Sequence, residues 1–367
     1  MNGVFFRVMK KLILSRSFWF GLALVAVLFF TAKSMIRAGQ VSYEQGGVNS
    51  EEGGKVKEAS VPKYKPLDTL AYDAKMLALA NYTISTTTAS STVTHLWPVK
   101  TVYPNPGAIL PDRRIIAYYG NLYSKGMGVL GKYPEDEMLA RLKVEVDKWN
   151  AADPGTPALP ALHYIAVTAQ LSPQPDKKYR LRMPDSQIDE VLRIAEKIDA
   201  IVFLDIQVGL SNLQSEVPLL EKYLKMPNVH LGIDPEFSMK TGARPGTVVG
   251  TMDASDINFT ANYLARLVKE NNLPPKVLVV HRYTQAMVTN YELIKPLPEV
   301  QIVMHMDGWG GAAKKRNTYQ RFVYSEPVQF AGFKLFYKHD ILDTGTVLMT
   351  PEDLLSLKPR PVYIQYQ

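Results

Sequence analysis

Short apolar runs recur from residue 115 to the end of the chain, separated by helix-like or loop sequence. The runs are rich in Val, Ile, Phe and Tyr and are apolar on both faces, which is typical of parallel strands buried on both sides. Eight such strands with helices between them predict an α/β fold, the (β/α)8 TIM barrel, whose usual length of about 250 residues matches residues 111–367. The runs occupy residues 115–120, 162–167, 200–207, 229–234, 276–282, 300–307, 332–337 and 361–366.

Several segments between these runs carry helix start signals. Residues 134–152 begin with proline and three acidic residues, which suits the positive end of a helix dipole. Residues 186–198 and 255–271 each begin at a serine, a good capping residue. A further short helix is predicted over residues 67–82. Because the last strand ends with the chain, we expect this helix either to take the place of the eighth barrel helix or to stand free as a stalk.

The N-terminal part of the chain predicts attachment to a membrane. Residues 18–32 form an uncharged apolar run that follows four basic residues, the pattern of a secretory signal or a signal anchor. We favour an uncleaved single-pass anchor within residues 1–38, with cleavage and secretion as the alternative. The basic residues should stay in the cytoplasm, so the barrel would lie on the extracytoplasmic side of the cell membrane. Residues 39–110 are predicted to be a flexible linker that contains the short helix.

Charge and composition exclude several classes of function. The net charge of +7 is concentrated around the apolar N-terminal run, so we expect no nucleic-acid partner. The chain has no cysteine, which excludes disulfides, thiolate metal sites and a cysteine nucleophile. A GxxxxGK[ST] phosphate loop is absent. We therefore expect no cofactor and no resident metal.

Two carboxyl groups follow the fourth predicted strand, in the sequence Asp234-Pro235-Glu236. Alternate strand residues point the same way, so both side chains should face the barrel mouth, where the active sites of such barrels lie. Their proximity would raise one pKa and keep the other carboxyl ionised, the pairing that glycoside hydrolysis uses. In the alternative, Asp234 caps the following turn and Glu236 pairs with Lys240 or Arg244.

Other polar residues end the neighbouring strands. Asp205 and Asp307 would complete a catalytic set of carboxylates with the first pair, although Asp205 could instead be a structural partner of a neighbouring Arg or His. A divalent cation held by Asp205, Asp307 and the histidines is the less favoured alternative. A ring of amides, aromatic rings and bases suits a polyhydroxylated ligand. The predicted substrate-binding residues are Tyr118, Asn121, Gln207, His281, Arg282, His305, Trp309, Tyr337 and Gln365.

Six sequence segments are similar to those of a known protein family. They read RIIAYYGN, VFLDIQVG, GIDPEF, VVHRYT, MDGWG and GFKLFY. Together they resemble a family of bacterial membrane-anchored or secreted proteins with a low-complexity linker and a glycosidase-like TIM barrel. More loosely, the Asp-x-Glu motif is similar to that of the family 25 glycoside hydrolases, a likeness that carries over only to Asp234 and Glu236. The first-strand aspartate of that family has no counterpart here, since residues 118–121 read Tyr-Tyr-Gly-Asn.

These observations predict a glycoside hydrolase anchored at the cell envelope and acting on a cell-wall or surface polysaccharide. Glu236 would be the general acid and Asp234 the base. The alternative is a catalytically inactive barrel that binds a glycan or an envelope protein, because the same aromatic and carboxylate residues would serve binding.

Overall fold

The computed structural model describes residues 64–82 and 95–367. The apolar run at residues 18–32 and the linker up to residue 63 lie outside the described residues, as do residues 83–94. Within the described part of the chain, no helix combines the length and the apolar character needed to cross a membrane.

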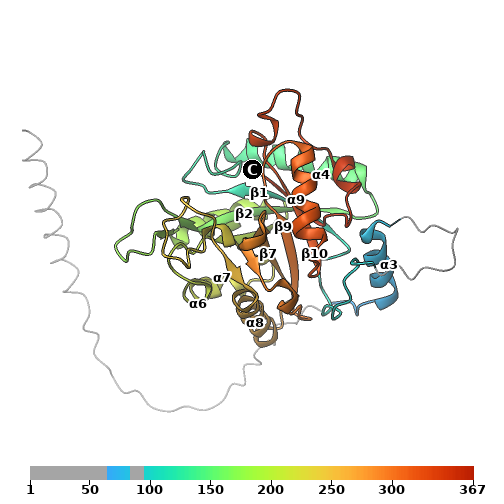
Figure 1. Cartoon of the computed structure of the whole chain (residues 1–367). Helices are drawn as coiled ribbons and strands as arrows, with labels where there is room; N and C mark the ends of the chain where they lie inside the picture. The colour runs from blue at the N-terminus through green and yellow to red at the C-terminus, as the bar shows by residue number, and fades with distance from the viewer. Residues whose placement is uncertain (1–63, 83–94) are drawn as a thin grey trace, which may run out of the picture. The chain divides into compact units, whose positions relative to one another are not determined.

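Eight parallel strands form a closed barrel, which confirms the predicted fold (Figure 1). Closure comes from the first strand, which pairs with the last strand on one side and with the second on the other. All eight predicted apolar runs are strands. They are β1 (Arg114–Gly120), β2 (Ala158–Ala169), β4 (Ile201–Ile206), β5 (Val229–Ile233), β7 (Lys276–Arg282), β9 (Val300–Met306), β10 (Phe330–Leu335) and β11 (Tyr363–Tyr366).

Three short strands lie outside the barrel wall. β3 (Arg180–Arg182) pairs antiparallel with the end of β2. β6 (Met252–Asp253) and β8 (Val288–Thr289) pair with each other in the loops that follow β5 and β7.

The predicted helices after the first, second and fourth strands are present as α4 (Glu135–Ala152), α5 (Asp185–Glu196) and α8 (Ala254–Asn271). Both predicted serine caps were wrong. α5 begins at Asp185 after Pro184 and has no side-chain cap, and Asp253 caps α8 in a reciprocal capping box with Asp256. Two single 3-10 turns replace a helix between β7 and β9. Shorter α-helices between the strands are α6 (Leu213–Glu216), α7 (Glu221–Leu224), α9 (Ala312–Tyr319) and α10 (Pro351–Leu355).

The helix predicted over residues 67–82 is α3 (Thr69–Ala80), blue in Figure 1. It buries an apolar stripe of Tyr72, Met76 and Leu79 in one cluster with Ile115 and Val277, which lie near the amino ends of β1 and β7. α3 therefore closes the amino-terminal end of the barrel. Both expectations for this helix were wrong, since it neither replaces an eighth outer helix nor stands free.

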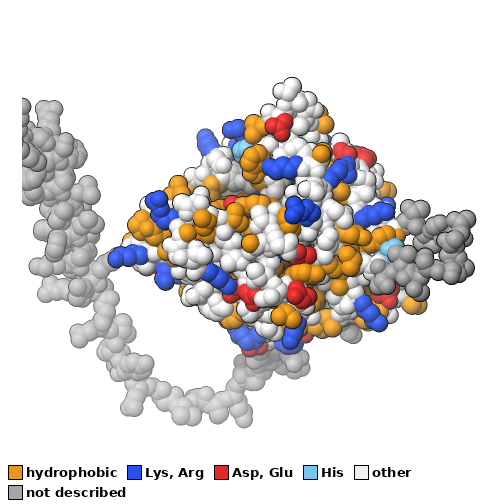
Figure 2. Space-filling view, in the orientation of Figure 1, with side chains coloured by type: hydrophobic (Ala, Val, Ile, Leu, Met, Phe, Trp, Pro, Cys, Tyr) orange, Lys and Arg blue, Asp and Glu red, His pale blue; other side chains and the backbone are white. Residues whose placement is uncertain are grey.

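The barrel interior changes character along its axis. Near α3 it is filled by apolar side chains such as Phe203, Val279 and Val303. Toward the carboxyl ends of the strands it becomes polar, and the buried residues there include three histidines, a lysine and aspartates. On the face drawn in Figure 2, Lys and Arg are interspersed with Asp and Glu and do not gather into one patch. The buried groups that could take part in chemistry therefore lie at the carboxyl-terminal end of the barrel interior.

Candidate functional site

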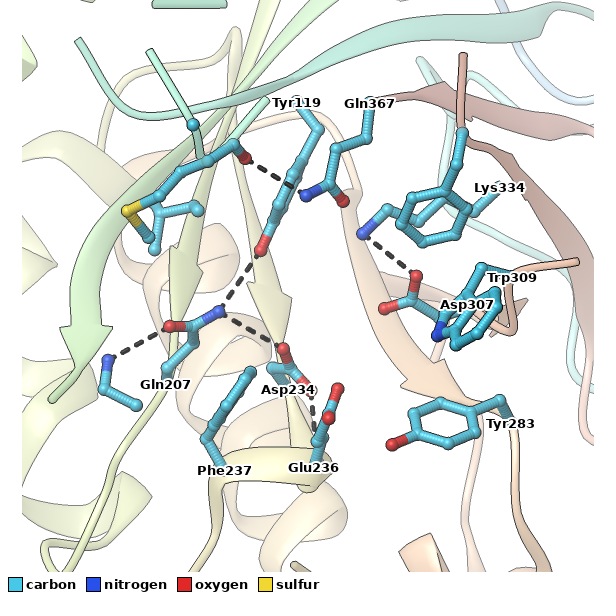
Figure 3. Close-up of a pocket in the computed structure, with 15 residues that line it drawn as sticks. Tyr119, Gln207, Asp234, Glu236, Phe237, Tyr283, Asp307, Trp309, Lys334 and Gln367 are labelled. Atoms are coloured by element: carbon cyan, nitrogen blue, oxygen red, sulfur yellow. Dashed lines mark hydrogen bonds and ion pairs between the residues drawn. The ribbon is translucent and has the colours of Figure 1, made fainter. Parts of the chain in front are cut away.

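A pocket of about 340 Å³ opens at the carboxyl ends of the barrel strands (Figure 3). Its volume lies at the lower end of the range for small-molecule sites, roughly 300–1,000 Å³. Carboxyl groups, amides and aromatic rings share its wall. The lining residues are Tyr119, Gly126, Met127, Ile165, Ala169, Gln207, Asp234, Glu236, Phe237, Tyr283, Asp307, Trp309, Lys334, Phe336 and Gln367.

A buried network of polar side chains lies next to this pocket inside the barrel. The hydroxyl of Tyr119 donates to Oδ2 of Asp205 at 3.0 Å. The other oxygen of this carboxylate, Oδ1, is 3.2 Å from Nε2 of His163 and 3.5 Å from Nε2 of His281. The opposite ring nitrogen of His281, Nδ1, is 2.7 Å from Oδ2 of Asp307, which itself lines the pocket.

The network continues to the last two strands of the barrel. Nζ of Lys334 is 2.9 Å from Oδ1 of Asp307 and lies 4.0 Å from the centre of the Tyr119 ring. On the opposite side, Nδ1 of His163 is 2.5 Å from the hydroxyl of Tyr363. Side chains from strands far apart in the sequence are thus joined into one connected group.

Gly232 makes this arrangement sterically possible. It lies on β5 beside Asp205, and a Cβ atom at this position would be 2.3 Å from Oδ1 of Asp205 and 2.5 Å from Nε2 of His163. Since non-bonded atoms do not approach so closely, any side chain here would displace the carboxylate or the imidazole.

Opposite charges fix the ionisation of the central residues. Burial alone would raise the pKa of Asp205, but the neighbouring His281 and His163 hold it well below its usual range. Burial likewise opposes ionisation of Asp307, and Lys334 and His281 outweigh it, so this pKa is also lowered. Burial would lower the pKa of His281, yet the two flanking carboxylates raise it to about 10. His281 is therefore a cation between two anions.

Two other buried histidines, His163 of the network and His305 beside it, are neutral. Burial lowers the pKa of His163 to about 4, although Asp205 opposes the shift. Burial also lowers the pKa of His305 well below its usual range. His305 is fully buried, and neither of its ring nitrogens has a hydrogen-bond partner among residues 64–82 and 95–367.

Asp234 and Glu236 both line the pocket, but strand alternation is not the reason. β5 ends at Ile233, and Asp234 caps the 3-10 turn Pro235–Phe237, its Oδ1 accepting from the Glu236 N–H at 3.1 Å. The alternative prediction for Asp234, in which its side chain caps the following turn, therefore agrees with the structure. The alternative ion pair between Glu236 and Lys240 does not form, because Lys240 pairs with Asp256.

The two carboxyl groups are both held toward their protonated forms. Burial raises the pKa of Asp234 well above its usual value. Burial also raises the pKa of Glu236, and the charge of Asp307 adds to the rise, while the hydroxyl of Tyr283 and the charge of Lys334 oppose it. Figure 3 shows the Glu236 carboxyl group turned into the pocket, with the Tyr283 hydroxyl pointing toward it.

Most of the other predicted site residues lie at the pocket or beneath it. Gln207 and Trp309 line the pocket. Asp205, His281, His305 and Gln365 are fully buried inside the barrel instead of being exposed at its mouth. The Nε2 group of Gln365 donates to the Tyr363 hydroxyl at 2.9 Å, so this amide belongs to the buried network.

Tyr118 and Tyr337 do not reach the pocket, so their prediction as part of its lining was wrong. Because neighbouring strand residues face opposite sides, the inward position of Tyr119 turns Tyr118 outward. The Tyr118 and Tyr337 hydroxyls are 3.2 Å apart in a second pocket beside α4, which also contains Glu145 and Arg141.

Asn121 and Arg282 are also absent from the pocket lining, because each is engaged with backbone atoms. The Asn121 amide donates to the Ile165 carbonyl and accepts from the Tyr123 N–H. The buried guanidinium of Arg282 pairs with Glu326 and donates to several loop carbonyls. Both residues hold loops in position.

Residues that sequence reasoning missed include His163 and Lys334. Each is a single polar residue within an otherwise apolar strand, in the sequences LHYIAV and GFKLFY. A charged or polar side chain in a buried strand is costly unless it is paired, so this contrast was the available signal.

The loop after β1 contains a GxGxxG glycine pattern, Gly126-x-Gly128-x-x-Gly131, which was overlooked when the absence of a cofactor was predicted. This is the spacing of a dinucleotide-binding loop, where the glycines directly follow a strand and open a helix. Here α4 begins only at Glu135. Cβ atoms at Gly128 and Gly131 would lie 2.2 Å and 2.1 Å from backbone oxygens of β1 and the residue after it, so close packing of the loop explains two of the three glycines.

No family model and no curated protein sequence matches the chain. Among solved structures, it is similar to Thermotoga maritima Cel5A in complex with cellobiose, at 10% identity over 68% of this chain and 88% of that chain, with a TM-score of 0.35. It is similar to Plasmodium falciparum HPPK-DHPS with pteroate, at 9% identity over 70% and 45% of the two chains, TM-score 0.33. A trimodular GH5_4 endoglucanase gives 11% identity, 70% and 56% coverage and a TM-score of 0.34.

Proposed function

We propose that this protein is a glycoside hydrolase that acts on a cell-wall or cell-surface polysaccharide. One observation carries the proposal: Glu236 and Asp307 line the same pocket, and their surroundings shift their pKa values in opposite directions. A protonated carboxyl beside an ionised one is the pair that cleaves a glycosidic bond, one as general acid and the other as base or nucleophile.

Glu236 takes the role of the general acid, since burial and the charge of Asp307 keep its proton on. Asp307 takes the role of the ionised carboxylate in place of Asp234, which the sequence had suggested. Asp234 is unsuited to that role, because it is buried, favours its protonated form and uses Oδ1 to cap the turn that carries Glu236. Asp234 instead positions Glu236 by capping the turn that carries it.

The remaining lining residues suit a sugar. Trp309 is 53% exposed, and with Phe237 it offers aromatic surface on which the apolar side of a pyranose can stack. The amides of Gln207 and Gln367 offer donors and acceptors for hydroxyl groups. A polyhydroxylated ligand would use both kinds of group.

A second candidate is a barrel that binds a glycan without cleaving it. It is favoured by the pairing of both Asp307 oxygens, one 2.7 Å from His281 and the other 2.9 Å from Lys334. A carboxylate held in this way is a weak base, so binding alone would also account for the pocket.

The test is the release of reducing ends from a panel of bacterial wall and surface polysaccharides by the full-length protein. Glu236→Gln should lower the rate at least 100-fold, a scale typical of lost acid catalysis, and should leave glycan binding intact. Glu292→Gln, which changes an exposed glutamate outside the pocket, is the matched control and should keep full activity.

The two candidates give different outcomes. If the wild type and Glu236→Gln bind the same glycan and neither cleaves it, the binding barrel is the correct function. Equal cleavage rates in Glu236→Gln and wild type would remove Glu236 from the mechanism. If no glycan on the panel is bound or cleaved, both candidates are contradicted.

The proposed location is the outer side of the cell membrane, with the membrane itself as a partner. Its support is the sequence, in which basic residues precede the apolar run at residues 18–32. A substrate outside the cytoplasm follows from this location.

A further inference from the structure

Three atoms of the buried network face one another without hydrogen bonds. They are Nε2 of His163, Nε2 of His281 and Oδ1 of Asp205, and none has a hydrogen-bond partner within the described ranges 64–82 and 95–367. All three side chains are fully buried. Since buried polar atoms in folded proteins are nearly always satisfied, a shared partner at this point would resolve three exceptions together.

We propose that His163, Asp205 and His281 bind a divalent transition-metal ion, with Zn²⁺ as the ion that suits these donors best. Binding would displace the proton that His281 otherwise carries on Nε2, so the neutral imidazole would be the ligand and the ion would take over the positive charge that faces Asp205. Two imidazole nitrogens and one carboxylate oxygen are common zinc ligands, and the absence of thiolates does not weaken such a site. The site goes beyond the proposed glycan hydrolysis, and its existence does not depend on that activity.

The spacing of the three atoms fits a common ion. Zinc bonds of about 2.0–2.1 Å in tetrahedral geometry separate two ligand atoms by about 3.3 Å. The Asp205 oxygen is 3.2 Å from the His163 nitrogen and 3.5 Å from the His281 nitrogen. A ligand atom from each of the three residues lies within 4.8 Å of the others.

The outer nitrogens of both imidazoles are already oriented, as is usual for metal-bound histidines. Nδ1 of His281 is 2.7 Å from Oδ2 of Asp307, and Nδ1 of His163 is 2.5 Å from the Tyr363 hydroxyl. These contacts turn both Nε2 atoms toward Asp205. The second oxygen of Asp205 accepts from Tyr119, which fixes the carboxylate in the same way.

A second cluster of possible ligands, His281, His305 and Asp307, suits an ion less well. The contact of 2.7 Å between His281 and Asp307 is a hydrogen-bond distance, shorter than the separation of two ligands on one zinc ion. His305 remains a nearby further donor, with its ring centre 5.1 Å from that of His281.

The bound ion would act on the pocket through the residues that support it. Asp307 and Tyr119 line the pocket, and they are also the residues that hold His281 and Asp205. The ion would therefore fix the position of the ionised carboxylate in the pocket. His163, Asp205 and His281 are positioning residues in this scheme, since none of them lines the pocket.

The experiment measures the metal content of the full-length protein, purified in detergent without a histidine tag. Mass spectrometry of the elements should find about one zinc per chain, and a chelator-treated sample should regain it with a rise in melting temperature. Co²⁺ added to the chelated wild type should give the visible absorption of a tetrahedral site. The cobalt spectrum is measured on the wild-type protein, so it tests the site even if the ligand variants fail to fold.

Asp205→Asn and His163→Gln should lose the metal and the zinc-dependent rise in melting temperature. His230→Gln is the matched control, because His230 is equally buried on β5 but belongs to neither cluster, and it should keep the metal. A wild type that contains no metal and shows neither zinc-dependent stabilisation nor a cobalt spectrum would overturn the proposal. Full metal content in both ligand variants would overturn the assignment of ligands.

Discussion

His281 and Asp307 lie 2.7 Å apart, with the ring Nδ1 facing the carboxylate Oδ2, at the boundary between the buried interior and the pocket. Asp307 lines the pocket, whereas His281 is fully buried and also faces Asp205. The ionisation of a pocket carboxylate is thereby tied to charges that solvent does not reach. Changes inside the barrel should therefore alter chemistry at its mouth.

Replacing Tyr283 with Phe should move the alkaline limb of the pH–rate profile to higher pH. The Tyr283 hydroxyl stabilises the ionised form of Glu236 and so lowers its pKa. Without the hydroxyl this pKa rises, and the acid keeps its proton to a higher pH, so kcat/KM falls later as the pH increases. The profile of the full-length protein on a cleaved glycan measures the shift.

The matched control for this change is Tyr123→Phe, since Tyr123 is 69% exposed and lies outside the pocket lining. Its profile should equal that of the wild type. If the alkaline limb of the pH–rate profile of Tyr283→Phe stays in place or moves to lower pH, the role of Glu236 as the general acid is contradicted.

Gly232→Ala should destabilise the barrel by about 1–3 kcal/mol, the usual cost of adding volume to a packed interior. The added Cβ would lie 2.3 Å from Oδ1 of Asp205, which is fully buried. Denaturant unfolding of the full-length protein measures the free energy. Gly155→Ala is the control, because the nearest atom to its Cβ is 3.6 Å away, and equal stability of the two variants would show that the interior relaxes freely.

Leu79→Ala should lower the free energy of unfolding by about 2–5 kcal/mol, as for other buried leucines. Leu79 packs α3 against the amino-terminal end of the barrel and is 6% exposed. Leu77 is on the same helix but 54% exposed, so Leu77→Ala should change the free energy by less than about 0.5 kcal/mol. Similar values for both variants would mean that α3 does not stabilise the barrel.

Protease added to intact cells or spheroplasts should degrade the barrel, while untreated barrel should sediment with the membrane fraction. The expectation rests on the basic residues before the apolar run at residues 18–32, which should remain in the cytoplasm. A cytosolic protein in the same cells serves as the control for intact membranes. Protection of the barrel from protease would reverse the topology and remove an external polysaccharide as the substrate.

Part of the site could be read from the sequence, because the polar residues that end apolar runs come together in a parallel barrel. Gln207, Asp234, Glu236, Asp307 and Trp309 were all found in this way, and all line the pocket. The prediction was wrong for Tyr118, because it required knowing which of two adjacent strand residues faces the barrel interior. Two adjacent tyrosines end the first strand, and nothing in their own sequence distinguishes the inward from the outward one.

The sequence by itself determined the barrel, because strands buried on both faces must be apolar throughout, and eight such runs with connections between them leave few other folds. Only the tertiary structure decided how the interior is charged. His163, Asp205 and His281 come from three different strands, and their ionisation depends on contacts made across the barrel after it has closed. Charge interactions act through distance in space and not along the chain, so the pattern of residues could not reveal which carboxyl group keeps its proton.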